Sequence, residues 1–128
     1  MVQFLSLDYW KQVEVIANED EQFKMKAMGF TGSFTFRVTD RDNLPPVYVR
    51  WEGAVVKEVR PLNEGEKTDY ALEATYDIWS QVNKGELDGA NAIMTRMIQS
   101  KGNMSMIIRY SKAFLRLFEV MQTVEVEY

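Results

Sequence analysis

The sequence contains no histidine and no cysteine. These two absences exclude a Cys or His nucleophile, a Ser-His-Asp triad, and a zinc site with thiolate or imidazole ligands. They also exclude a disulfide framework, which fits a reducing compartment, so we expect a cytoplasmic protein. No apolar run approaches the ~18 residues that a membrane span needs, and the N-terminus lacks the basic-then-apolar order of a signal peptide.

Catalytic motifs are absent as well. The sequence has no G-x-G-x-x-G, no Walker loop and no G-x-S-x-G. Asp40-x-Asp42 begins like a calcium loop, but Leu44 and Trp51 stand where that loop needs oxygen ligands. We therefore expect a protein that is not an enzyme and that holds no metal and no cofactor.

What the chain has is a soluble globular composition. It contains 128 residues, 46% of them hydrophobic and 27% charged, and its mean hydropathy is -0.30. At this length a chain can build a core without metal or disulfides. No Pro- and Ser-rich linker divides it, so we expect one domain over residues 1–128.

The charge is unevenly distributed. The formal net charge is -4, which disfavours nucleic acid as a partner. Residues 96–116 nevertheless contain no Asp or Glu. The basic residues of this segment are Arg96, Lys101, Arg109, Lys112 and Arg116. The segment is therefore a basic region in an acidic protein.

Apolar periodicity divides the chain into three parts. The first 28 residues have helical spacing, with Ser6 as the cap of one helix and Asn18 as the cap of a second that ends before Gly29. Residues 30–74 alternate with a period of two, which predicts strands over 30–38, 47–52, 54–60 and 70–74. Because the connections are short, we expect these four strands to form an antiparallel meander.

The last third predicts helices again. Thr75 and Asp88 are good N-caps for two short helices. Residues 96–100 are interpreted as a fifth strand, with one continuous helix over residues 90–99 as the alternative. A long terminal helix is expected from Asn103 to about Gln122. The fold class is therefore α+β: a five-stranded, mainly antiparallel sheet covered on one face by helices.

The terminal helix has an unusually wide apolar surface. Ser105, Arg109, Lys112, Arg116 and Glu119 recur at spacings of three and four, so they share one narrow polar stripe. Nearly everything else between residues 104 and 121 is apolar, although one sheet requires an apolar face only about 100° wide. The apolar surface that the sheet does not cover should pack against neighbouring helices, pack against a second subunit, or line a cavity that holds an apolar ligand.

Motifs in this region resemble those of the sterol carrier protein 2 family. They are Tyr76-Asp77-Ile78-Trp79, Lys84-Gly85-Glu86-Leu87-Asp88, Ala92 with Met94, and Ser100-Lys101-Gly102-Asn103-Met104. The resemblance covers about residues 30–122 and is of the stand-alone, prokaryotic type. Thr95 stands where that family often has glycine. The resemblance implies an apolar tunnel that binds fatty acids, acyl-CoA or sterol-like lipids.

A lipid site would use the apolar surface of the terminal helix and the inner face of the sheet. Helical spacing places Met104, Ile107 and Ile108 on one face, and strand alternation supplies the opposing wall. The predicted ligand-binding residues are Phe36, Trp51, Leu72, Trp79, Met94, Met97, Met104, Ile107, Ile108, Phe114 and Phe118. The alternative is a homodimeric scaffold, or an accessory subunit of a lipid- or cofactor-modifying enzyme, with a filled interior.

The three basic residues of the polar stripe, Arg109, Lys112 and Arg116, form a basic stripe that also allows two interpretations. They could pair with acidic residues on a solvated helix face. They could instead dock an anionic lipid head group or make transient contact with an anionic membrane.

Overall fold

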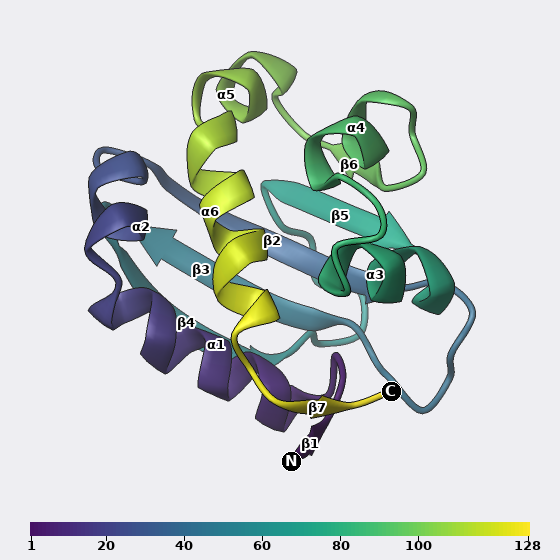
Figure 1. Cartoon of the computed structure of the whole chain (residues 1–128). Helices are drawn as coiled ribbons and strands as arrows, with labels where there is room; N and C mark the ends of the chain where they lie inside the picture. Colours follow the sequence, from purple (N-terminus) through teal and green to yellow (C-terminus); the bar gives the residue numbers. More distant parts are fainter.

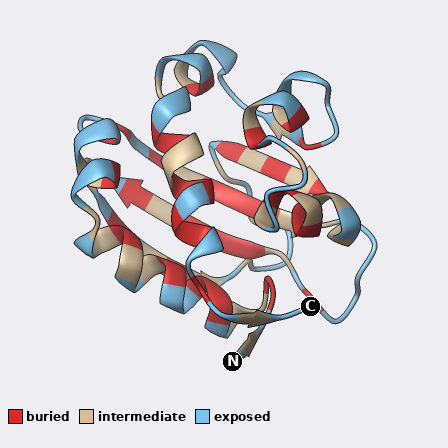
Figure 2. Cartoon of the chain, in the orientation of Figure 1, coloured by how far each residue is buried: buried red, intermediate tan, exposed pale blue.

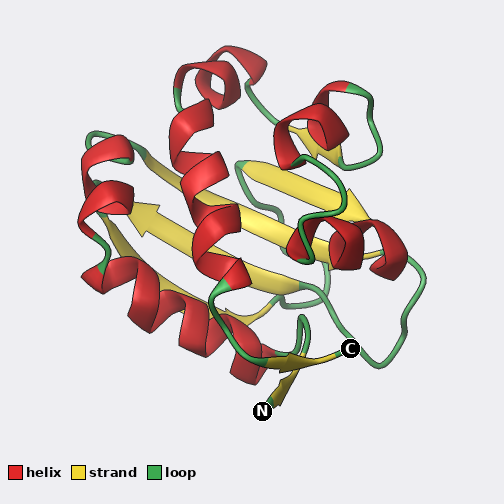
Figure 3. Ribbon diagram, viewed as in Figure 1, coloured by secondary structure: helices red, strands yellow, loops and turns green.

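The centre of the fold is a five-stranded mixed sheet with the strand order β4-β3-β2-β5-β6. The computed structural model describes residues 1–128. The strands are β1 (Val2–Gln3), β2 (Thr31–Val38), β3 (Val47–Glu52), β4 (Val55–Pro61), β5 (Tyr70–Ala74), β6 (Gln99–Lys101) and β7 (Val126–Glu127). The helices are α1 (Leu7–Glu19), α2 (Glu21–Lys26), α3 (Tyr76–Asn83), α4 (Gly89–Met94), α5 (Met104–Arg109) and α6 (Ser111–Gln122). All the helices lie on one face of the sheet (Figures 1 and 3), as predicted.

The expected antiparallel meander is wrong at one position. β4 pairs antiparallel with β3, and β3 pairs antiparallel with β2. β5, however, pairs in parallel with β2, and Phe36 lies opposite Leu72. β5 is therefore separated from β4 by two strands, and the sheet is mostly rather than wholly antiparallel.

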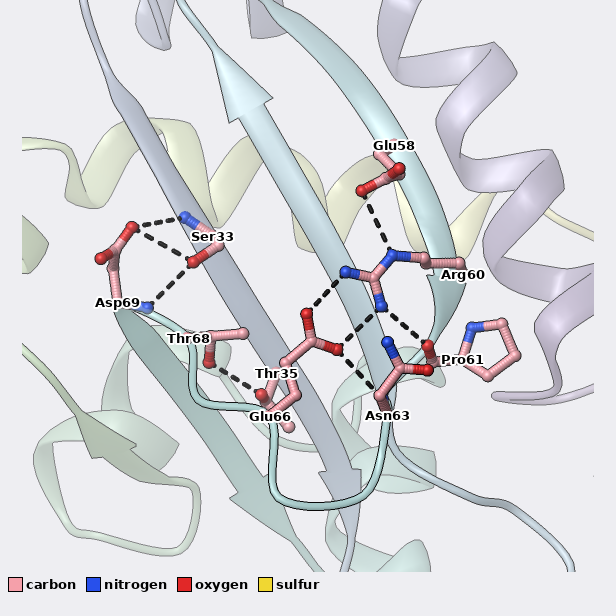
Figure 4. Close-up of polar contacts among 9 residues, drawn as sticks. All are labelled: Ser33, Thr35, Glu58, Arg60, Pro61, Asn63, Glu66, Thr68 and Asp69. Atoms are coloured by element: carbon pink, nitrogen blue, oxygen red, sulfur yellow. Dashed lines mark hydrogen bonds and ion pairs between the residues drawn. The ribbon is translucent and has the colours of Figure 1, made fainter.

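The connection from β4 to β5, residues 62–69, crosses the open face of the sheet and brings β5 beside β2 (Figure 4). Side-chain contacts hold it against the strands beneath. The Arg60 guanidinium binds Glu66 at 2.8 and 2.6 Å, and the hydroxyl groups of Thr35 and Thr68 lie 2.8 Å apart. Because these contacts join β2 and β4 to the loop between β4 and β5, alternation within a single strand could not indicate them.

The N-terminal helices have the expected order but not the expected caps. Ser6 caps α1, as predicted. The cap of α2 is Asp20, whose carboxylate accepts from the Phe23 amide at 2.8 Å; the prediction of Asn18 was wrong. Asn18 instead makes two hydrogen bonds with the backbone of Val56, at 3.0 and 2.8 Å. Its side chain therefore fastens α1 to β4.

The single long terminal helix is also a wrong prediction. Asn103 begins the helix as expected, but Tyr110 interrupts it with φ -104° and ψ 21°, which divides it into α5 and α6. The Tyr110 ring packs edge-on against Phe30, with the ring centroids 4.9 Å apart. Because the helical geometry breaks at Tyr110, α5 turns away from the axis of α6 (Figure 1).

The fifth strand is shorter than predicted. β6 begins at Gln99 rather than at Arg96, and it includes Lys101. Arg96 has φ +63°, in the left-handed region, so it ends the turn after α4 and cannot extend a strand. The order of helix, strand and helix in the last third is otherwise as predicted.

The core lies between the inner face of the sheet and the helices (Figure 2). Its centre is aromatic: the Phe34 ring lies 4.9 Å from both Trp51 and Tyr70, and Phe114 of α6 packs edge-on against it at 5.4 Å. A second, two-stranded sheet pairs β1 in parallel with β7. The sequence did not indicate this small sheet.

Candidate functional site: an apolar cavity beside the edge strand

A cavity of about 880 Å³ lies where α4, β6, α5 and the first turn of α6 meet. Its lining residues are Ala90, Ile93, Met94, Arg96, Gln99, Ser100, Lys101, Met104, Ile107, Ile108, Ser111, Phe114 and Leu115. Most of them are hydrophobic. Ligand sites in proteins span about 300–1,000 Å³ and are lined mainly by apolar side chains. The cavity therefore has the size and the lining of a small-molecule site.

Two glycines bring the walls of the cavity into place. Gly89 begins α4 directly against Phe118 of α6, and a Cβ atom there would lie 2.8 Å from Cε2 of the ring. Gly102, with φ +123°, turns the chain between β6 and α5, and a Cβ atom there would lie 2.7 Å from the Asp69 carbonyl oxygen. Only glycine allows these close approaches, so both positions fix how α4 and α5 flank the cavity.

The cavity has a buried floor and an exposed rim. Ile107 and Phe114 are buried and form the floor. Met94, Ile108 and Met104 are 82%, 68% and 47% exposed. Apolar side chains with this exposure place the rim in solvent, so the cavity is open and a ligand can enter without a movement of the core.

The polar part of the lining carries one sign of charge. Arg96 and Lys101 both line the cavity, and no Asp or Glu does. Lys101 Nζ lies 3.0 Å from Oε1 of Glu73, whose other oxygen binds Arg37. Arg96 makes no ion pair. The charged side chains of the lining are therefore all cationic, although the chain as a whole is negative.

The structure separates the predicted ligand-binding residues into three groups. Met94, Met104, Ile107, Ile108 and Phe114 line the cavity. Met97 is exposed and lies outside the lining. The remaining five, Phe36, Trp51, Leu72, Trp79 and Phe118, are buried in the core and do not reach the cavity.

The core residues fall outside because α1 and α6 cover the inner face of the sheet. Phe36 packs on Trp10 of α1 with the ring centroids 4.5 Å apart, and Trp51 lies 5.5 Å from Phe114 of α6. A void of about 10 Å³ remains between Trp10 and Trp51. It is too small for anything beyond one water molecule. The ligand-sized space is therefore at the edge of the sheet and not along its face.

Several lining residues were missed. Ala90 and Ile93 were missed although they share one face of α4 with the predicted Met94, because the three residues recur at the helical spacings of three and four. That signal was available in the sequence. Gln99, Ser100, Ser111 and Leu115 carry no comparable signal, since only the arrangement of β6 and α6 around the cavity brings them to it. Arg96 and Lys101 were noted as basic residues but were not assigned to the site.

Arg116 differs from the other two residues of the basic stripe because it forms ion pairs within the protein. Its guanidinium makes two 2.8 Å contacts with the Asp20 carboxylate and a third with Glu119, so it joins α6 to α2. The hydrogen bonds from Arg116 lower the pKa of Asp20 from 3.8 to about 2. Arg116 therefore has the pairing of a structural residue. Arg109 and Lys112 are exposed and make no ion pair, and the Arg109 guanidinium lies 5.7 Å from the Tyr110 ring centroid.

The open face of the sheet carries a second polar cluster but no comparable cavity (Figure 4). Arg60 stacks on the Tyr48 ring at 3.9 Å and binds both Glu58 and Glu66. The hydrogen bond from Arg60 lowers the pKa of Glu66 to about 2. These groups satisfy one another, which is the arrangement of a surface network that fixes a loop.

No three His, Cys, Asp or Glu side chains converge on a point where they could ligate a metal ion. None of the helices has the length and hydrophobicity required to cross a bilayer.

The fold and the cavity together define a small α+β domain with one open, apolar, ligand-sized site. Comparison with protein families matches residues 12–115 to the SCP-2 sterol transfer family. The match covers most of the chain, so the protein belongs to this family of lipid-binding and lipid-transfer domains. The resemblance seen in the sequence is confirmed.

Solved structures agree on the fold. A crystal structure of sterol carrier protein 2 is similar with a TM-score of 0.85 and 19% identity, covering 96% of this chain and 100% of that one. A solution structure of a conserved hypothetical protein from Thermus thermophilus, described as possibly a sterol carrier protein, has a TM-score of 0.84 and 18% identity over 99% and 93%. A ubiquinone synthesis protein, UbiJ-SCP2, is similar at 0.54 and 10% over 87% and 90%. A search of curated proteins finds no match.

Proposed function

We propose that this protein binds a lipid in the cavity between α4, β6 and α5, and that it carries the lipid without chemical change. The observation that carries the proposal is the open cavity of about 880 Å³, whose wall is mostly apolar. Its ligand would be a fatty acid, an acyl-CoA or a sterol-like lipid, with the apolar part on the floor formed by Ile107 and Phe114. Family membership supports this class of ligand.

Burial of the apolar body would supply the affinity. Each methylene removed from water contributes about 0.8 kcal/mol. Methionine side chains at the rim, Met94 and Met104, are flexible and adapt to differing shapes. Most of the lining is hydrophobic, so few of its groups could select a ligand through specific hydrogen bonds. We therefore expect a broad range of lipid ligands.

Ligand capture tests the proposal directly. Native mass spectrometry of the purified protein should reveal copurified lipid. After delipidation, the neutral fluorophore N-phenyl-1-naphthylamine should bind saturably and be displaced by palmitate. The unfolded protein serves as the control for nonspecific partition. A delipidated, folded protein with no saturable uptake would contradict the proposal.

A second candidate function rests on the exposed apolar rim. Met94, Met97, Met104 and Ile108 present apolar surface in one region of the chain. Such surface is also suited to a homodimer or to an accessory subunit docked on a lipid- or cofactor-modifying enzyme. Light scattering together with fluorophore uptake distinguishes the two proposals, because a carrier takes up the fluorophore, whereas a scaffold that uses the rim is dimeric and excludes it.

Arg109 and Lys112 would support transient contact with an anionic membrane. They are exposed, make no ion pair, and neighbour the cavity residues Ile108 and Ser111 along the chain. No acidic residue occurs from position 89 to 118. Each basic residue near an anionic bilayer contributes about 1 kcal/mol, so this contact would be weak and sensitive to salt.

A further inference from the structure

Arg96 has a backbone conformation that L-residues with side chains seldom adopt. Its φ is +63°, and its amide donates to the Ile93 carbonyl at 3.2 Å, just after the C-cap Thr95 of α4. Helices commonly place glycine at this position, because glycine adopts the left-handed conformation without steric cost. An arginine here strains the backbone.

Leu5 shows how such strain is normally compensated. It is the one other residue besides glycine with positive φ, at +66°, and it is only 3% exposed within the core. Burial of its side chain offsets the strained backbone. Arg96 has no such compensation, since its side chain is exposed and makes neither an ion pair nor a side-chain hydrogen bond within the protein. A strained residue without an internal partner points to a role in binding.

The surroundings of Arg96 show what it could bind. It lines the cavity together with Lys101, and no carboxylate shares that lining. Lys101 is already engaged by Glu73 at 3.0 Å, which leaves the Arg96 guanidinium as the unpaired cation of the mouth. A guanidinium offers a planar pair of N–H donors that matches the two oxygens of a carboxylate.

We infer that Arg96 is a specificity-determining residue that binds the carboxylate of a fatty acid whose chain lies in the cavity. This inference rests on the proposed lipid-binding function and adds the selection of the head group. The guanidinium of Arg96 donates to the carboxylate, whereas Lys101, the other cation of the lining, stays paired with Glu73. A lipid of the same length without the negative charge gains nothing from Arg96.

The test compares Arg96→Gly with the wild-type protein on two ligands, palmitate and methyl palmitate, each displacing N-phenyl-1-naphthylamine. Glycine removes the cation and relieves the strain, so affinity and stability should change in opposite directions. We expect the palmitate affinity to fall about tenfold, the value of one charge-assisted hydrogen bond. The methyl palmitate affinity should change less than about twofold. The thermal unfolding midpoint should be equal to that of the wild type or a few degrees higher.

Two variants serve as controls. Arg96→Lys keeps a cation at the mouth but lacks the planar pair of donors, so it should retain only part of the preference for palmitate. Lys57→Gln removes an exposed, unpaired cation of β4 that lies outside the cavity lining, so it should bind both ligands as the wild type does. Unchanged folding of each variant is verified by circular dichroism.

The outcomes are separable. If Arg96→Gly binds palmitate as tightly as the wild type, or loses both ligands to the same extent, the assignment of Arg96 is overturned. A wild-type protein that prefers methyl palmitate also overturns it. If the wild type takes up the fluorophore but binds palmitate and methyl palmitate equally well, the carrier function stands and the inference about Arg96 fails. If the wild type takes up no fluorophore at all, it is the proposed function that fails.

Discussion

Gly89 at the start of α4 lies directly against the ring of Phe118 in α6, closer than any other residue type would allow. This contact sets the distance between the two helices and therefore the width of the cavity that they flank. Phe118 is itself held by the core, where its ring lies 6.4 Å from that of Trp79. It cannot swing away to admit a larger residue at position 89.

The first prediction follows from this contact. Gly89→Ala should push α4 outwards, lower the free energy of unfolding by about 1–3 kcal/mol and weaken lipid uptake. Urea unfolding and fluorophore titration measure the two effects. Asn91→Ala is the matched control, because Asn91 lies on the exposed side of the same helix. Equal stability of Gly89→Ala and Asn91→Ala would show that α4 accommodates the added methyl group without strain.

The second prediction concerns Ile108, which lines the cavity although it is 68% exposed. Ile108→Trp should narrow the mouth and reduce uptake of palmitate about tenfold, with a stability change within about 0.5 kcal/mol because the site is on the surface. Met25→Trp, at an exposed methionine of α2 outside the cavity, is the control. A parallel loss of uptake and stability in Ile108→Trp would mean that the residue acts through the core.

The third prediction is a loss of stability in acid. Arg116 lowers the pKa of Asp20 from 3.8 to about 2 in the folded protein. The folded state therefore binds fewer protons than the unfolded state in this range, and the ion pair stabilises the protein above about pH 4. The stabilisation is lost as the pH falls from about 4 towards 2. After allowance for the partial exposure of the pair, it amounts to about 1–2 kcal/mol.

Asp20→Asn isolates this contribution. The amide oxygen of asparagine can still cap α2 through the Phe23 amide, but it carries no charge for Arg116. The urea midpoint of Asp20→Asn should therefore fall less steeply between about pH 4 and 2 than that of the wild type. Some acid sensitivity should remain, because Arg60 also lowers the pKa of Glu66 to about 2. Identical pH profiles for the two proteins would exclude the Asp20–Arg116 pair as a source of acid sensitivity.

The fourth prediction concerns membrane contact. Wild-type protein should cosediment with vesicles of phosphatidylcholine and phosphatidylserine at low salt, and less so at moderate salt. Arg109→Glu with Lys112→Glu should reduce this binding at least about tenfold. Lys57→Glu with Lys67→Glu makes the same change of charge at exposed, unpaired residues away from the cavity. If the two double variants bind alike, the effect is one of net charge, and Arg109 and Lys112 have no specific role.

Local patterns predicted the fold well where a single element determines its own structure. The alternation in residues 47–52 and 70–74 predicted β3 and β5 with their observed bounds, and Thr75 and Asp88 cap α3 and α4 as expected. The parallel pairing of β5 with β2 was not predictable in this way. It depends on a crossover held by contacts such as Arg60 with Glu66, which join residues on different elements.

In the candidate site, too, the sequence predicted what a single element determines and not what depends on contacts between elements. Helical spacing placed Met104, Ile107 and Ile108 on one apolar face, and these residues line the cavity. Strand alternation placed Phe36 and Leu72 on the inner face of the sheet, which is also where they lie. Alternation identifies a face but not whether another side chain already fills the space above it. The break at Tyr110 involves neither proline nor glycine, so the turn of α5 over the cavity had no local signal.

The pairing of β1 with β7 has a practical consequence for anyone who handles this protein. Val2 lies opposite Val126, and the Phe4 amide donates to the Glu127 carbonyl at 2.9 Å. The first and last residues therefore emerge side by side, on the opposite side of the molecule from α4 and α5 (Figure 1). An affinity tag or a fluorescent reporter fused at either position will stand clear of the cavity. A short linker between the ends would give a circular permutant whose new termini could be opened in the turn at residues 63–65, which lies outside the cavity lining.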